Sequence, residues 1–228
     1  MTESVFGICH ICGQDKKLSF EHVPPRAAFN DRPVLRTAFE DFLCSENPDE
    51  IKGKIQQRGA GAHTLCEKCN SDTGAWYGGA YAKWASQAMQ LIIETRGKPS
   101  LGYPFNLFPL RVLKQIICMF FSANSPQYQK LNTDLVRFVL NRESRDLPSR
   151  VRVYVFYTLS GRFRAIGATG VLRGLGSGNS SIDVIAEITF PPFGCVMTLG
   201  DSDPPDNRFV RSPVFRNSNI RIGTRACG

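Results

Sequence analysis

The chain has 228 residues, of which 42% are hydrophobic and 21% are charged, so it can bury a core and does not have the composition of a disordered chain. Its 28 lysines and arginines outnumber 20 acidic residues, and the net charge of +8 favours a polyanionic partner because each neutralised phosphate releases counterions. The longest apolar stretches, such as residues 116–121, are too short to cross a bilayer, which argues against a membrane protein.

The first part of the chain predicts short strands around a cysteine knuckle. Residues 5–20 have the pattern of a Cys-x-x-Cys knuckle between two short strands. Pro24 and Pro25 then end the second strand, because proline cannot continue a ladder of hydrogen bonds. Residues 30–61 are expected to form an inserted loop with a short helix near residues 35–43.

Helical patterns dominate the segment that follows. Asn70, Ser71 and Asp72 are typical of a helix start, where polar side chains cap free backbone amides. Apolar residues recur at three-to-four spacing over residues 80–96, which predicts an amphipathic helix. A Gly-Lys-Pro sequence at residues 97–99 ends it, and we expect a domain boundary there, with one domain at residues 1–97 and a second at 98–228.

The second half is expected to add helices and an antiparallel sheet, giving an α+β fold. Helical periodicity covers residues 110–122 and 127–141. Glycine- and serine-rich turns separate strand-like runs that predict a β-meander, at residues 151–158, 163–172, 182–190 and 194–199. This half offers no catalytic constellation, so it is expected to be an accessory domain, with contact to a protein partner or a second copy of the chain as one role.

The cysteines favour a metal site over disulfides. The first seven residues lack the basic segment of a signal peptide, so a cytoplasmic location is expected, where thiols stay reduced. Four of the eight cysteines form the pairs Cys9-x-x-Cys12 and Cys66-x-x-Cys69, which together suit a closed, structural four-thiolate zinc site. Cys118, which has no partner at ligand spacing, is expected to be a buried apolar side chain, as is Cys195.

Three segments together carry a resemblance to a known family. They are Cys9-His10-Ile11-Cys12-Gly13, Leu18-Ser19-Phe20-Glu21-His22-Val23-Pro24-Pro25 and Thr64-Leu65-Cys66-Glu67-Lys68-Cys69-Asn70. This order resembles that of the zinc-containing HNH endonucleases, also called ββα-metal nucleases. The resemblance covers about the first 75 residues, with a long insertion, and the combined pattern is specific although no single segment is.

The resemblance implies a fold, a site and an activity. The fold would be an N-terminal ββα-metal, zinc finger-like module followed by helices and a β-meander. His22 would be the general base, and Glu21 and Asn70 would hold a catalytic Mg²⁺ or Mn²⁺ ion. Imidazole, with an ordinary pKa of about 6.5, can accept a proton from water at neutral pH, and carboxylate and amide oxygens suit a hard ion. The expected reaction is hydrolysis of phosphodiester bonds, with DNA as the expected substrate and restriction or phage defence as the setting.

Two positions depart from the family pattern. The acid before the histidine is more often aspartate, and here it is Glu21, which is longer by one methylene. The middle residue of the family motif, usually an asparagine that steers the base, has no obvious counterpart. His63 is the candidate to orient His22 or to contact phosphate, unless it is an ordinary exposed residue, and Asn47 and Gln57 are weaker options.

Several alternatives stay open. Asn70 can be a helix N-cap as well as a metal ligand, and His10 can replace a cysteine as a zinc ligand. The whole chain can also be a non-catalytic zinc-binding module that recognises nucleic acid or a protein. Some aromatic residues after the second cysteine pair could stack on bases, although one of them, Trp84, falls on an apolar stripe and is expected in the core; they are Trp76, Tyr77, Tyr81 and Trp84.

Overall fold

The computed structural model describes residues 4–38, 47, 53–96, 103–158, 163–173, 181–200 and 220–223. The N-terminal part is a small antiparallel sheet in the order β1-β2-β5, formed by β1 (Phe6–Ile8), β2 (Asp15–His22) and β5 (Gly61–Cys66). The expected pair of short strands around the first cysteine knuckle is confirmed.

A second hairpin occupies the connection between β2 and β5. It pairs β3 (Val34–Arg36) with β4 (Lys54–Gln56) in antiparallel register, with Leu35 opposite Ile55. The helix expected near residues 35–43 is therefore wrong at its start, where the β-branched residues Val34 and Ile55 on the two strands favour strand pairing over a helix. Residues 39–43 lie outside the described residues.

A continuous helical segment follows β5. It consists of α2 (Glu67–Thr73), one π-helical turn, η2 (Gly74–Gly78), and α3 (Gly79–Glu94). The amphipathic helix expected over residues 80–96 is confirmed by α3, and Trp84 is buried against Phe193 with ring centroids 3.6 Å apart. The expected domain boundary at residues 97–98 lies outside the described residues.

The next helices are α4 (Pro109–Ala123), α5 (Gln127–Leu131) and α6 (Thr133–Leu140). The single helix expected over residues 127–141 is wrong, because it is divided at Asn132. This residue leaves helical geometry, and its Nδ2 donates to the carbonyl of Tyr128 at 2.8 Å. An asparagine side chain that bonds nearby backbone competes with the helical ladder, which accounts for the break.

The large sheet has the order β10-β6-β9-β8-β7. Its strands are β6 (Val151–Tyr157), β7 (Arg164–Arg173), β8 (Ser181–Phe190), β9 (Phe193–Leu199) and β10 (Ile220–Gly223). The expected meander is confirmed for β7, β8 and β9, whereas β6 pairs with β9 rather than β7, and β10 runs parallel to β6. The α+β class with an antiparallel sheet is confirmed.

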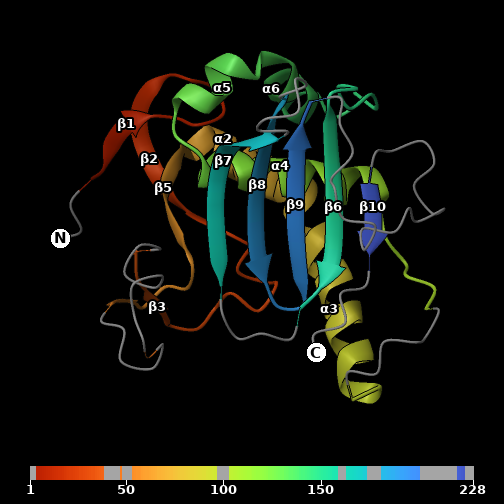
Figure 1. Cartoon of the computed structure of the whole chain (residues 1–228). Coiled ribbons are helices and arrows are strands. Elements are labelled where there is room, and N and C mark those ends of the chain that lie inside the picture. The colour runs from red at the N-terminus through yellow and green to blue at the C-terminus, as the bar shows by residue number, and fades with distance from the viewer. Residues whose placement is uncertain are drawn as a thin grey trace.

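Helix α4 is at the centre of the molecule, behind the large sheet and beside the small one (Figure 1). All its residues from Val112 to Phe121 are buried, including Cys118. One hydrophobic core joins it to the cysteine knuckle, α3 and the large sheet, where Cys195 is also buried, as expected. The core thus includes residues on both sides of the expected domain boundary. No helix in the described ranges is both long and apolar enough to span a membrane.

Candidate metal centre and adjoining cavity

Four cysteine sulfurs converge where the small sheet meets α2. Cys9 and Cys12 come from the knuckle after β1, Cys66 ends β5, and Cys69 lies on α2. Their Sγ atoms all lie within 4.8 Å of one another, and those of Cys12 and Cys66 are 3.9 Å apart. A tetrahedral zinc ion with Zn–S bonds of about 2.3 Å places its sulfurs about 3.8 Å apart. The four cysteines can therefore bind a metal such as zinc.

The first knuckle is shaped by a tight turn around its cysteines. The amide of Gly13 donates to the carbonyl of Cys9 at 2.9 Å, with Gly13 at a φ of 70° that favours glycine. A Cβ at Gly13 would also lie 2.6 Å from Nε2 of Gln129. His10 is not part of the sulfur cluster, because its Nδ1 lies 3.2 Å from the carbonyl oxygen of Phe121.

Hydrogen bonds and burial shift the pKa values of three thiols of the cluster. A hydrogen bond from the Cys69 thiol lowers the pKa of Cys9 to about 4, and the same hydrogen bond, together with burial, raises the pKa of Cys69. Burial also raises the pKa of Cys12. A bound divalent ion would deprotonate its thiol ligands.

A cavity of about 410 Å³ lies between the end of β2, the helical segment from α2 to α3, and α4. Three of the expected site residues line it together: Glu21 and His22 from the end of β2, and Asn70 from α2. Its wall includes glycines of the π-helical turn and the start of α3, and a Cβ at Gly74 or Gly79 would meet no atom within 4 Å. The cavity therefore has an open side along this helical segment.

Glu21 is a buried carboxyl group at the cavity. It is 7% exposed, and burial raises its pKa to about 8. No hydrogen bond or ion pair involves this carboxyl group within the part of the chain that the structure describes. A buried carboxylate without a partner is costly, and a bound cation would remove most of that cost. Glu21 thus has the chemistry of a metal ligand.

The ring of His22 is oriented by a backbone carbonyl. Its Nε2 lies 2.8 Å from the carbonyl oxygen of Arg58. Because a carbonyl only accepts hydrogen bonds, Nε2 carries the proton in this contact, and Nδ1 is left with a lone pair. Burial lowers the pKa of His22, which favours the neutral imidazole that a general base requires.

Among the described residues, the amide oxygen of Asn70 accepts no hydrogen bond. Its Nδ2 donates to Oγ of Ser19 at 3.0 Å and to the carbonyl of Phe20 at 3.1 Å, both on β2. The helix begins at Glu67, with Cys66 at the N-cap position, so the alternative of Asn70 as an N-cap is wrong. With its nitrogen held by β2, Asn70 has Oδ1 available for a ligand of the cavity.

Asn30 joins the segment after β2 to the segment before β5. It is 1% exposed; its Nδ2 donates to the carbonyls of Pro24 and Ala60, both at 2.7 Å, and its Oδ1 accepts from the amide of Ala60 at 2.6 Å. These bonds hold the segment after β2 against the segment that carries the Arg58 carbonyl. Gly59 completes the contact, because a Cβ there would clash with the carbonyl oxygen of Asn30.

His63 lies elsewhere. It is exposed on β5 opposite Phe20, and its ring packs edge-on against Phe20, as the ring of His22 also does, at centroid distances of 5.5 and 4.9 Å. It does not line the cavity, and neither Asn47 nor Gln57 does. The orienting contact expected from His63 is made by the Arg58 carbonyl.

Gln115 of α4 is the cavity residue that the sequence analysis missed. It is 2% exposed, lines the cavity beside Gly78, and its Oε1 has no hydrogen-bond partner among the described residues. A buried amide oxygen without a donor is unfavourable unless a cation or water meets it. The sequence signal for this residue was its position directly before the apolar run of residues 116–121, because polar side chains are uncommon among buried apolar ones.

Replacing Asn30 with alanine is expected to reduce both stability and the order of the cavity. Loss of its three buried hydrogen bonds should lower the free energy of unfolding by about 2–4 kcal/mol, measured by denaturant unfolding. Asn124→Ala is the control, because Asn124 also bonds backbone groups, at Phe120 and Ala168, but does not line the cavity. Only the Asn30 variant should also broaden the imidazole NMR signals of His22, because these bonds hold the segment that carries the Arg58 carbonyl; unchanged signals would contradict this coupling.

Comparison of the chain with protein-family models, with curated proteins and with solved structures finds no match. Conclusions about function therefore depend on the geometry of the chain itself.

Proposed function

We propose that this protein is a metal-dependent endonuclease of the HNH type, which hydrolyses phosphodiester bonds of nucleic acid, with DNA as the main substrate. The observation that carries the proposal is that Glu21, His22 and Asn70 line one cavity, with Asn70 directly after Cys69 of the four-cysteine cluster on α2. These residues lie 49 positions apart at the extremes, and the pairing of β2 with β5 brings them to one place.

Each polar group of the cavity has a part in this chemistry. Nδ1 of His22 takes a proton from the attacking water, and the Arg58 carbonyl holds the ring in the required tautomer. The carboxylate of Glu21 and the amide oxygens of Asn70 and Gln115 form an oxygen-rich set that suits Mg²⁺ or Mn²⁺. A divalent ion bound there would stabilise the negative charge that develops on the phosphate and on the leaving oxygen.

The four cysteines have a structural part in the proposal. A zinc ion bound by four thiolates has no open coordination position, so it cannot activate water itself. It would instead fix the knuckle after β1 to the junction of β5 and α2, which also carries Asn70. The net charge of +8 and the open glycine side of the cavity further support a nucleic-acid backbone as the ligand.

The proposal is tested by plasmid cleavage with added Mg²⁺, added Mn²⁺ or EDTA, with the zinc content of the protein determined in each sample. We expect cleavage with either added ion and none with EDTA. Glu21→Gln, which keeps the shape but removes the charge, should need roughly 10–100-fold more metal for half-maximal cleavage, the scale on which losing a charged metal contact acts. DNA binding without cleavage under every condition would instead indicate the non-catalytic zinc-binding module.

A further inference from the structure

A second cavity, of about 270 Å³, adjoins the same helical turn as the first. Trp76 and Tyr77 of η2 line the second cavity, whereas Gly74 and Gly78 of the same turn line the first. The division repeats on α4, where Lys114 lines the second cavity and its neighbour Gln115 lines the first. The two cavities therefore share η2 and α4 in their walls.

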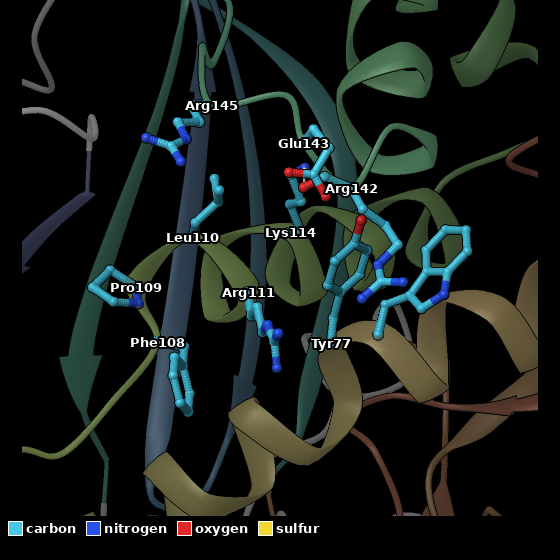
Figure 2. A pocket seen from close by; sticks show the side chains of 10 residues that line it. Tyr77, Phe108, Pro109, Leu110, Arg111, Lys114, Arg142, Glu143 and Arg145 are labelled. Carbon is cyan, nitrogen blue, oxygen red and sulfur yellow. Dashed lines mark hydrogen bonds between the residues drawn. The ribbon is translucent and has the colours of Figure 1, made fainter.

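The second cavity combines cationic and aromatic side chains. The guanidinium of Arg111 lies over the ring of Phe108, 5.1 Å from its centroid, and that of Arg142 lies over Trp76, at 5.7 Å. Phe108 is 54% exposed at the rim. Figure 2 shows the side chains of Arg111 and Arg142 on either side of Tyr77, with Arg145 standing apart from both. Guanidinium groups bind phosphate, and aromatic rings and guanidinium planes stack on bases, so this lining suits a nucleotide.

A buried lysine fixes the backbone that carries two of these arginines. Lys114 is 0% exposed, and its Nζ donates to the carbonyls of Asn141 and Arg142, at 2.6 and 3.1 Å, just beyond the end of α6. The hydroxyl of Tyr77 donates to the carbonyl of Val139 at 2.8 Å, which ties η2 to the same helix end. Arg142 and Arg145 are thus presented from an anchored segment, which lowers the entropic cost of binding.

We propose that the second cavity binds one unpaired nucleotide of the strand whose phosphodiester bond lies in the first cavity, an inference that rests on the proposed nuclease function. The base would stack at Phe108 and Arg111, and the phosphate would meet Arg142. Bases of an intact duplex are stacked and cannot enter such a cavity, so the proposed site selects single-stranded or locally opened nucleic acid.

The test is fluorescence anisotropy of a labelled single-stranded oligonucleotide, with zinc-loaded His22→Ala protein and no added Mg²⁺ or Mn²⁺, so that cleavage does not enter the measurement. Arg142→Ala should weaken binding roughly threefold to tenfold at low salt and lower the slope of log K against log salt by about 1, as expected for one lost phosphate contact. Arg137→Ala is the matched control, because Arg137 is exposed on α6 and lines neither cavity. Equal effects of the two substitutions would overturn the proposal.

Base stacking is tested in the same assay by Phe108→Ala, against Phe6→Ala as a control on an exposed phenylalanine of β1. Loss of one stacked base should weaken binding roughly fivefold or more, and Phe6→Ala should have no effect. Weaker binding of the duplex of the same sequence than of the single strand supports the proposal. It is overturned if Phe108→Ala binds the single strand as tightly as the parent protein does, or if a free mononucleotide binds more tightly than the strand. If the wild-type protein bound the oligonucleotide but did not cleave plasmid DNA, the nuclease proposal would be refuted and the proposed nucleotide-binding site would not.

Discussion

Cys69→Ala is expected to remove bound zinc and to unfold the junction between the small sheet and α2. Cys69 lies on α2, and its sulfur is within 4.8 Å of the other three of the cluster. Structural zinc contributes roughly 10–16 kcal/mol to the folding of zinc-finger peptides, and a whole domain is stable by only about 5–15 kcal/mol. Losing one ligand should thus cost roughly 5 kcal/mol or more, or about 10–20 °C in Tm for a chain of this size.

The measurements are zinc content by elemental analysis and Tm by thermal unfolding, with Cys118→Ala as the matched control. Cys118 is equally buried but lies on α4, outside the sulfur cluster. The Cys118→Ala protein should keep its zinc. Its free energy of unfolding should fall by only about 1–2 kcal/mol, because removing a single buried sulfur leaves a small cavity. If Cys69→Ala retained the zinc content and Tm of the wild type, the four cysteines would not form a structural metal site.

The cysteine site could be predicted from the sequence because its information is local. Cys-x-x-Cys at positions 9 and 12, followed by Gly13, specifies a knuckle by itself, and the spacing of Cys66 and Cys69 places both sulfurs at one strand-to-helix junction. The pairing of β2 with β5 joins the two cysteine pairs. The periodicity of α3 was likewise sufficient to predict its buried face.

The other residues of the cavity could not be predicted, because no local sequence pattern specifies the tertiary contacts that bring them there. The group that orients His22 is the backbone carbonyl of Arg58, and any residue type supplies a carbonyl. Asn30 and Gln115 reach the cavity from a loop and from α4, and only the tertiary fold brings them there. The pairing of β6 with β9 similarly joins strands far apart in the chain, which local turn patterns cannot specify.

His22→Ala is expected to reduce nucleic-acid cleavage by roughly 10²–10⁴-fold, the usual contribution of a general base. The imidazole Nδ1 is the one basic nitrogen that His22 offers to the cavity, since Nε2 faces the Arg58 carbonyl. Loss of that single hydrogen bond should lower the free energy of unfolding by only about 1 kcal/mol, so zinc content and far-UV circular dichroism should stay at wild-type values. The lower cleavage rate would then result from a slower chemical step and not from misfolding.

His63→Ala provides the matched control for this loss. Both histidines pack edge-on against the ring of Phe20, but His63 is exposed on β5 and does not line the cavity. Its removal should change the cleavage rate by less than about threefold, because it touches neither the attacking water nor an oxygen ligand. If both variants lost the same fraction of the cleavage rate, the role of His22 would be its packing against Phe20 and not proton transfer. A pronounced difference in rate at equal stability leaves proton abstraction as the remaining role for His22.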